Sequence, residues 1–174
     1  IISTNDVPER DAGYHVTFRI TEACDLACDY CDWHGGSHYE YNDIIKSVDV
    51  LFTFFRKENI KSVVFYYHGG EASRHPKIVN ILQYIHQKGD EYGITALNEL
   101  QTNLTIPLKK LEHILPHVDF LNITFHYLEL IRRRYKLQSF INNFKYITLQ
   151  NIRITNLDVM LEKIDPKDLN EFRD

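Results

Sequence analysis

Cysteine is scarce in this sequence: the chain of 174 residues has three, and all of them fall between positions 24 and 31. A small, odd and clustered set argues against a disulfide framework and predicts thiols that stay reduced. Long apolar runs are also missing, so we expect no membrane-spanning segment, and the N-terminus lacks the basic and then apolar pattern of a secretory signal. These absences favour a cytoplasmic protein.

Excess positive charge is missing too, since the formal net charge is −4. Proteins that bind a nucleic-acid backbone or an anionic membrane are usually basic, so the composition argues against both partners. The one basic run, Arg132-Arg133-Arg134, is too short to change this conclusion. Hydrophobic residues make up 44% and charged residues 25% of the chain, which is typical of a globular domain that buries a sizeable core.

Along the chain, segments in which apolar residues alternate as in a strand are followed by segments in which they repeat as on a helical face. Tyr14 to Ile20 alternates as a strand does, whereas Ile44 to Phe55 repeats on one helical face. After an irregular lead-in at residues 1–13, we expect one core domain, 14–174, of about five βα units. The strands are expected at 14–20, 61–67, 94–100, 118–125 and 152–161. The helices are expected near 44–55, at 78–85 with an end at Gly89, at 108–114 and at 140–147, and a last one starts at Asp165-Pro166.

This alternation predicts the α/β class, with a parallel sheet covered by helices. An open doubly wound sheet and a barrel both fit the order of the elements. In either architecture ligands bind at the carboxyl ends of the strands, so the residues at those ends predict where the site lies. These residues are the cysteines after the first strand, His68 to Glu71 after the second, Gln101 to Asn103 after the third, and Thr124 and His126 on the fourth.

The cysteines have the spacing Cys24-x3-Cys28-x2-Cys31. Thiolates are the usual ligands of iron–sulfur clusters, and a cubane of four irons normally takes four of them. Three thiolates leave one iron open to a small molecule, as a catalytic zinc keeps one position open. A zinc site with His34 or His38 as the fourth ligand is the alternative that the spacing leaves open.

Two motifs carry a resemblance to a known family. Cys24-Asp-Leu-Ala-Cys28-Asp-Tyr30-Cys31 resembles the cluster loop of the radical S-adenosylmethionine (radical SAM) superfamily, which also has an aromatic residue before its third cysteine. His68-Gly69-Gly70-Glu71-Ala72 resembles that superfamily's Gly-Gly-Glu-Pro motif, with alanine in place of proline. The motifs follow consecutive strands, and together they are specific. The resemblance implies a partial (βα)5-6 TIM-like barrel with the active site at the C-terminal ends of its strands, here minimal or truncated.

The resemblance also implies the cofactors and the reaction. A [4Fe-4S] cluster on the three cysteines would bind S-adenosyl-L-methionine at its open iron and cleave it reductively. The product would be a 5′-deoxyadenosyl radical that abstracts hydrogen from a substrate. Such an enzyme is oxygen-sensitive and needs an external electron donor of the flavodoxin or ferredoxin type.

Roles for residues at the strand ends follow from the same resemblance. Gly69, Gly70 and Glu71 would hold the ammonium group of the cofactor, and Tyr30 would contact its adenine. Thr124 would bond the cofactor carboxylate or ribose. An arginine of the run 132–134, taken as Arg134, would bind the cofactor carboxylate, and Asn103 would also bind the cofactor. His126 would have a catalytic role, and Trp33 would shield the cluster. Met160 and Glu162 would pack in the core or contact the adenine.

The substrate is less defined than the chemistry. Gln101 and Asn103 resemble residues that precede a glycine in peptide-modifying relatives, which favours a peptide or protein substrate, although Leu104 replaces that glycine and predicts a different loop. With five strands instead of six, the barrel keeps an open edge, for which two expectations stay open: it admits a large substrate, or a further chain or domain covers it. The alternatives are a small activase acting on a partner enzyme and a non-catalytic domain that binds a cluster or another metal.

Overall fold

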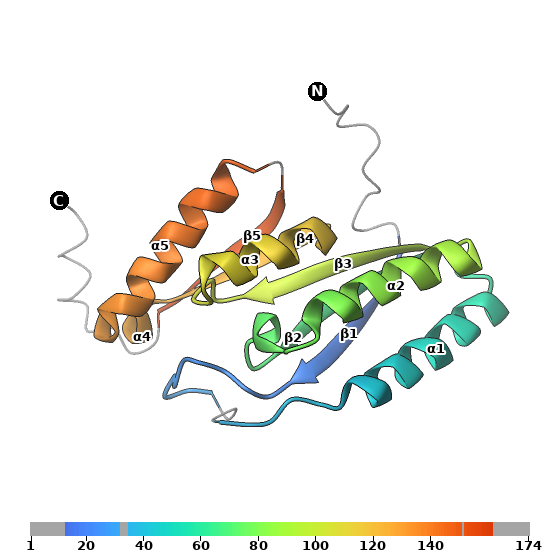
Figure 1. Cartoon of the computed structure of the whole chain (residues 1–174), viewed down its shortest axis with the longest axis horizontal. Helices are drawn as coiled ribbons and strands as arrows, with labels where there is room; N and C mark the ends of the chain where they lie inside the picture. Colours follow the sequence, from blue (N-terminus) through green and yellow to red (C-terminus); the bar gives the residue numbers. More distant parts are fainter. Residues whose placement is uncertain (1–12, 32–34, 151, 162–174) are drawn as a thin grey trace.

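The computed structural model describes residues 13–31, 35–150 and 152–161. Strands and helices alternate along the chain, as the sequence predicts (Figure 1). The lead-in up to residue 12 and the helix predicted from Asp165-Pro166 lie outside the described residues. The elements are β1 (Tyr14–Thr21), α1 (Tyr41–Lys57), β2 (Ser62–Gly69), the 3-10 helix η2 (Ala72–Arg74), α2 (Ile78–Tyr92), β3 (Thr95–Thr102), α3 (Leu108–Ile114), the 3-10 helix η3 (Leu115–His117), β4 (Phe120–His126), α4 (Tyr127–Arg132), α5 (Arg134–Thr148) and β5 (Arg153–Met160).

The five strands form one parallel sheet in the order β1-β2-β3-β4-β5. This order decides between the two architectures that the sequence left open. A doubly wound sheet reverses its strand order at a switch point, whereas a barrel adds each new strand to the same edge. The chain is therefore an α/β protein built as a partial TIM-like barrel, which confirms the predicted fold class.

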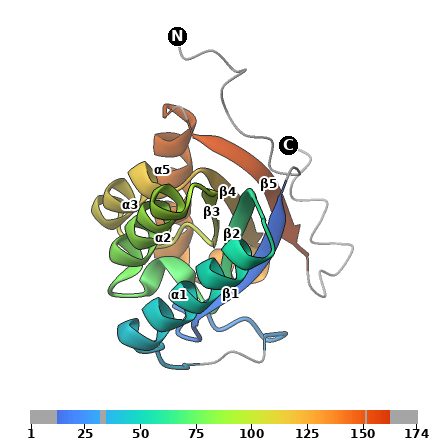
Figure 2. The ribbon, with the colours of Figure 1, turned by 90° about the vertical axis from the view of Figure 1, so that its right-hand side faces the viewer.

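Helices α1, α2, α3 and α5 lie on one side of the sheet (Figure 2). The main core fills the space between them and the strands. Phe52 on the apolar face of α1 is completely buried, and its ring stacks on that of Phe65 in β2 with centroids 5.9 Å apart. Burial of each such side chain contributes about 1.5–3 kcal/mol.

Helix α2 differs from its predicted length. The sequence predicts an end at Gly89, but the helix continues to Tyr92 and ends at Gly93, whose φ of 65° is in the left-handed region that favours glycine. Gly89 is instead a packing residue. A Cβ at this position would lie 2.7 Å from the carbonyl oxygen of Ile94, so only glycine lets the helix approach the start of β3 this closely.

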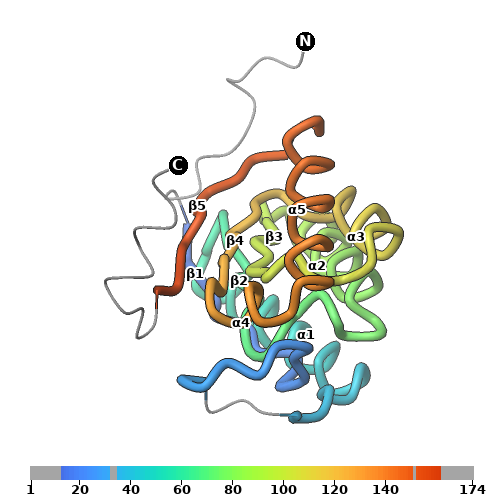
Figure 3. Tube along the Cα trace, turned by 90° about the vertical axis from the view of Figure 1, so that its left-hand side faces the viewer, coloured from blue at the N-terminus to red at the C-terminus, as the bar shows by residue number. Residues whose placement is uncertain are grey.

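The other face of the sheet changes character along the strands. Towards their N-terminal ends it carries the buried apolar residues Val64, Leu97 and Phe120. Because side chains alternate between faces, the same face carries His68, Gln101 and Thr124 towards the C-terminal ends. The loop after β1 lies at this polar end, beside α4 and the start of α5 (Figure 3).

Candidate metal and cofactor site

One cavity lies at the C-terminal ends of the strands, and most of the predicted site residues line it. They come from segments that are far apart in the sequence: the loop after β1, the end of β2, the end of β3 and the end of β4. The lining residues are Cys24, Leu26, Cys28, Tyr30, Cys31, Gly69, Gly70, Glu71, Gln101, Thr102, Asn103, Thr124 and His126. The expected gathering of polar and metal-binding groups is thus what the fold produces.

The three cysteines are free thiols that border the core. Cys28 is buried, and Cys24 and Cys31 are partly buried. Burial raises the pKa of Cys24 to about 12, and burial also raises the pKa of Cys28. An empty site therefore favours protonated thiols, and a bound metal would displace these protons, because the thiolate is the ligand form.

Glycine is required after β2 because the backbone of the cysteine loop passes very close to it. The N–H of Gly70 donates to the carbonyl oxygen of Thr21 at 3.1 Å, and the N–H of Glu71 donates to that of Ala23 at 2.8 Å. A Cβ on Gly70 would lie 2.4 Å from the Ala23 oxygen, and Gly69 has a φ of 131°. The double glycine thus fixes the cysteine loop against β2, whatever contact it makes with a cofactor.

Glu71 is buried at the centre of the site, with only 2% of its surface exposed. Its Oε1 accepts hydrogen bonds from the Ser73 hydroxyl, the Ser73 N–H and, at 2.8 Å, the Thr102 hydroxyl. Its Oε2 accepts the N–H of Asn103 at 2.7 Å. Burial raises the pKa of Glu71, and these donors favour its ionised form. The carboxylate therefore ties the end of β2 to the end of β3, and its predicted contact with a cofactor ammonium group stays a prediction.

The loop after β3 turns inwards. The Nδ2 of Asn103 lies 3.9 Å from the Cys24 sulfur and 3.3 Å from Oδ1 of Asp25, so its side chain supports the cysteine loop. Leu104, which replaces the glycine of the motif that this segment resembles, keeps a left-handed backbone with φ 53° and is fully buried. Burial of its side chain offsets a strain of about 1–2 kcal/mol.

His126 and Tyr30 meet beside the second cysteine. The Tyr30 hydroxyl and the His126 Nδ1 form a hydrogen bond, and their rings stack with centroids 6.1 Å apart. The same Nδ1 lies 3.5 Å from the Cys28 sulfur. Burial lowers the pKa of His126, so the neutral ring is favoured. On the same strand, the Thr124 hydroxyl accepts a hydrogen bond of 3.4 Å from Gln101.

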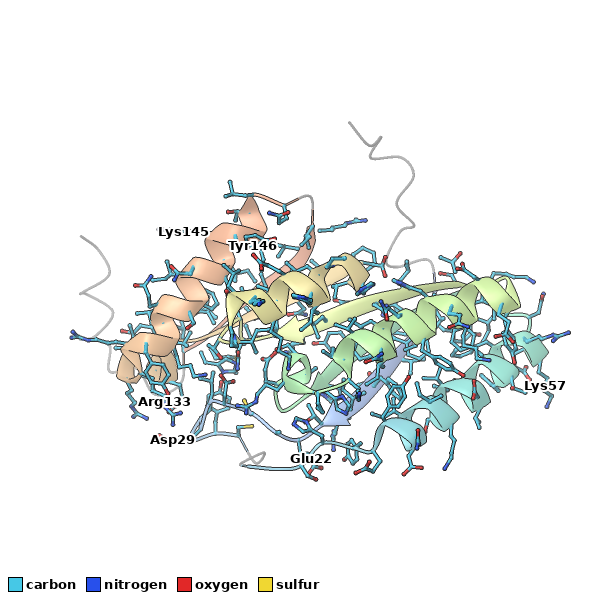
Figure 4. The ribbon with its side chains drawn as sticks, viewed as in Figure 1. Glu22, Asp29, Lys57, Arg133, Lys145 and Tyr146 are labelled. Carbon is cyan, nitrogen blue, oxygen red and sulfur yellow. The ribbon has the colours of Figure 1, made fainter. Side chains whose placement is uncertain are left out.

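The arginine predicted to contact the cofactor, Arg134, does not line the cavity. It is exposed at the start of α5. Arg132 instead forms an ion pair of 3.2 Å with Asp29 of the cysteine loop, and Arg133 donates to the carbonyl oxygen of Asp25 at 3.3 Å. Figure 4 shows Arg133 and Asp29 at the same end of the molecule, opposite Lys57. A contact of Arg134 with a cofactor stays a prediction.

Asp25 and Lys136 are site residues that sequence reasoning missed. Asp25 Oδ2 accepts from the Thr105 hydroxyl at 2.7 Å and is ion-paired with the Lys136 ammonium group. Burial opposes ionisation of Asp25, but Lys136, Thr105 and Asn103 outweigh it, so its pKa lies below the ordinary value. Lys136 is far from the cysteines in the sequence, and no pattern there links the two.

The remaining predicted residues are Trp33, Met160 and Glu162. Trp33 and Glu162 are outside the described residues. Met160 lines a smaller cavity that adjoins the first one and shares Cys28, Tyr30 and His126 with it. Of the candidate zinc ligands, His38 bonds the Thr21 hydroxyl at 2.7 Å, and His34 is not described. Within the described ranges, no three His, Cys, Asp or Glu side chains converge on a single ion.

The residues present fit an open iron–sulfur site. All three thiols border one cavity, and a cubane distributes its thiolates over separate irons, so they need not converge on one ion. The glycine backbone beside them keeps the cavity free of a Cβ that would enter the cysteine loop. Fold and site together define a parallel βα protein with a three-cysteine site at the strand ends.

Comparison with known protein families assigns this chain to one of them. The family model described as the radical SAM superfamily matches residues 18–174, so the chain belongs to this superfamily. The superfamily uses a [4Fe-4S] cluster and S-adenosylmethionine, which confirms the predicted cofactors, and membership implies an enzyme in general terms. In the described part of the chain, no helix is long and apolar enough to cross a membrane.

Other comparisons add little. No curated protein is significantly similar to this sequence. A solved structure of a mutant O-GlcNAc hydrolase from Thermobaculum terrenum superposes with a TM-score of 0.38 at 12% identity, over 84% of this chain and 34% of the hydrolase chain. This chain thus spans about a third of that enzyme, and so distant a likeness carries no argument about function.

Proposed function

We propose that this chain is a radical SAM enzyme that takes a hydrogen atom from a peptide or protein substrate. The observation that carries the proposal is one cavity bordered by all three thiols and by the Gly69-Gly70 backbone. Bound there, the cluster and S-adenosylmethionine supply reductive cleavage and hydrogen abstraction. The family match supports this chemistry in general terms, and the substrate class rests on the residues at the end of β3.

The residues of the chain bind and orient the reactants. Cys24, Cys28 and Cys31 would each hold one iron of the cluster, which would leave one iron without a protein ligand. The close packing of Gly70 against the cysteine loop sets where a cofactor can approach. His126, neutral and bonded to Tyr30, can accept or donate a hydrogen bond at the cavity wall.

Reductive cleavage consumes an electron, and the three cysteines of this sequence supply ligands for one cluster. We infer a donor of the flavodoxin or ferredoxin type. Exposed apolar residues on β5, Leu157 and Val159, support the expectation that another chain or domain covers this edge of the barrel.

The proposal is tested with protein reconstituted with iron and sulfide without oxygen. We expect the absorption of a [4Fe-4S] cluster, an electron paramagnetic resonance signal after reduction, and 5′-deoxyadenosine after S-adenosylmethionine is added. Cys28→Ser should lower 5′-deoxyadenosine formation at least about a hundredfold, since loss of a ligand removes the cluster. Lys145→Met on the far end of α5 is the control and should retain full activity.

Two outcomes would refute the proposal. A stoichiometric zinc that survives air, with no iron, would establish the zinc site instead. A stable cluster without S-adenosylmethionine binding would establish a non-catalytic cluster domain. Trapping of a peptide-derived radical, against nucleosides and sugars as competitors, tests the substrate class separately.

A further inference from the structure

We propose that Lys136 of α5 is a positioning residue. It acts through Asp25 to hold the loop after β1, which contains the three cysteines, in its metal-binding conformation. Lys136 contacts no predicted ligand of the cluster. It forms an ion pair with Asp25, the residue that directly follows Cys24. The proposal deepens the proposed function and rests on it, since it takes Cys24 as a cluster ligand.

The ion pair lies inside the protein. The side chains of Lys136 and Asp25 are 15% and 9% exposed, so little water screens or replaces their interaction. Three further groups complete the surroundings of Asp25. Its Oδ2 accepts the Thr105 hydroxyl at 2.7 Å, its Oδ1 accepts Asn103 Nδ2 at 3.3 Å, and its carbonyl oxygen accepts Arg133 at 3.3 Å. Asp25 is thus held on both its side chain and its backbone.

The same helix also holds the loop that supports Cys24 from the other side. Asn143 of α5 is buried and donates from Nδ2 to the carbonyl oxygens of Leu104 and Ile106, both at 2.7 Å. Asn103, which precedes Leu104, lies 3.9 Å from the Cys24 sulfur. Helix α5 therefore holds both the loop after β1 and the loop after β3, and Cys24 lies where these two loops meet.

Removing Lys136 should release this loop, not unfold the sheet. A buried carboxylate that loses its cation draws in water or turns outwards, because a buried charge without a partner is unfavourable. Asp25 is held through its backbone carbonyl oxygen as well as its side chain, and Cys24 is the adjacent residue, so we expect a displaced Asp25 to shift Cys24 with it. The main core between the sheet and α1 and α2 contains neither side chain of the pair.

The experiment compares Lys136→Met, Lys136→Arg and Lys145→Met in the full chain. Lys136→Met keeps the length of the side chain and removes its charge, and Lys136→Arg restores a cation. Lys145→Met removes the same charge from the last turn of α5, away from the cysteines (Figure 4). The readouts are alkylation of Cys24 by iodoacetamide in metal-free protein, followed by mass spectrometry, and iron loss from reconstituted protein to a chelator.

We expect Cys24 in Lys136→Met to be alkylated about tenfold faster than in the unaltered protein, and iron to be lost faster by a similar factor. Lys136→Arg should largely restore both rates, and Lys145→Met should not change them. The double variant Asp25→Asn with Lys136→Met should be closer to the unaltered protein than Lys136→Met alone, because no buried charge is then left without a partner.

Unaltered rates of both alkylation and iron loss in Lys136→Met would overturn the proposal. So would an equal rise in amide hydrogen exchange throughout β2 and β3, because that would show general destabilisation and no local positioning. The alkylation measurement uses metal-free protein. If the unaltered chain takes up no iron, the proposed function fails, while the effect of Lys136 on the loop is still measured.

Discussion

Both ends of the sheet bury polar side chains whose hydrogen bonds are made within the protein, but only at the C-terminal end do these side chains surround a cavity bordered by thiols. In the N-terminal half, Asn98 of β3 is completely buried. Its Oδ1 accepts the Tyr67 hydroxyl at 2.7 Å, and its Nδ2 donates to the carbonyl oxygens of Leu82 at 3.1 Å and His117 at 3.0 Å. All polar atoms of this side chain thus have partners within the protein, and no ligand is needed.

At the C-terminal end, Asn103 and Glu71 are buried and bonded in the same way, but they surround a cavity that three thiols border. The pKa of Cys24 is raised to about 12, so its thiolate, which is the form that binds metals, would be unfavourable without a bound metal. The comparison shows that a buried polar network alone does not identify a binding site. A stronger indication of a binding site is a polar network that supports thiols at the wall of a cavity.

The largest expected effect on iron binding comes from replacing a glycine at each end of the sheet: Gly70 beside the cysteine loop and Gly93 before β3. Gly70→Ala places a Cβ 2.4 Å from the Ala23 oxygen, so the cysteine loop must move. We expect a loss of about 2–3 kcal/mol in the free energy of unfolding and almost complete loss of iron binding. Gly93→Ala is the control, because its Cβ meets nothing within 4 Å. It should cost about 1 kcal/mol for its left-handed φ and leave iron binding unchanged.

Iron analysis of the purified, reconstituted variants and urea unfolding of their metal-free forms measure the two quantities. Normal iron content in Gly70→Ala would show that the close approach of β2 to the cysteine loop does not matter for metal binding.

The two buried asparagines should give the next largest difference in iron binding. Asn98→Ala leaves the Tyr67 hydroxyl and two carbonyl oxygens without their partner, and it should cost about 3 kcal/mol of stability. Iron content per folded chain should not change. Asn103→Ala should cost about 2 kcal/mol and also lower iron content, because its amide supports Cys24 and Asp25. Equal iron contents in the two variants would remove the functional distinction between the two ends.

The smallest expected effect concerns pH and His75, which is buried next to η2. Its Nδ1 accepts the N–H of Lys77 at 3.1 Å and its Nε2 bonds the carbonyl oxygen of Tyr39 at 3.0 Å, which requires the neutral ring. Burial lowers its pKa below 6.5, so the unfolded chain binds the proton more readily. The stability that this residue contributes is present above pH 6.5 and is lost as the pH falls below it.

Urea unfolding of metal-free protein at pH 7.5 and 5.5 would measure this loss. His75→Gln should show a smaller drop between the two pH values than the unaltered chain, and His113→Gln, at an exposed position on α3, should show the same drop. An identical drop in all three proteins would mean that His75 contributes no pH dependence.

Much of the fold could be predicted because local patterns decide it. The alternation in β1 and the apolar stripe of α1 identify these elements without tertiary information, and their order predicts the parallel sheet. The end of α2 could not be predicted in this way. Gly89 looks like a helix end in the sequence, but its reason for being glycine is contact with Ile94 and Ala96, which a local pattern does not contain.

For the site, the sequence by itself determined the motifs of the superfamily and hence its cofactors, and it predicts Cys24, Cys28 and Cys31 as the cluster ligands. Only the tertiary structure decided what supports them. It placed Lys136 on Asp25, bonded Glu71 to Asn103 instead of leaving it free, and kept Arg134 outside the cavity. The physical reason is that ligand spacing is a property of neighbouring residues, whereas a partner for a buried charge can come from any segment that the packing of the helices brings close.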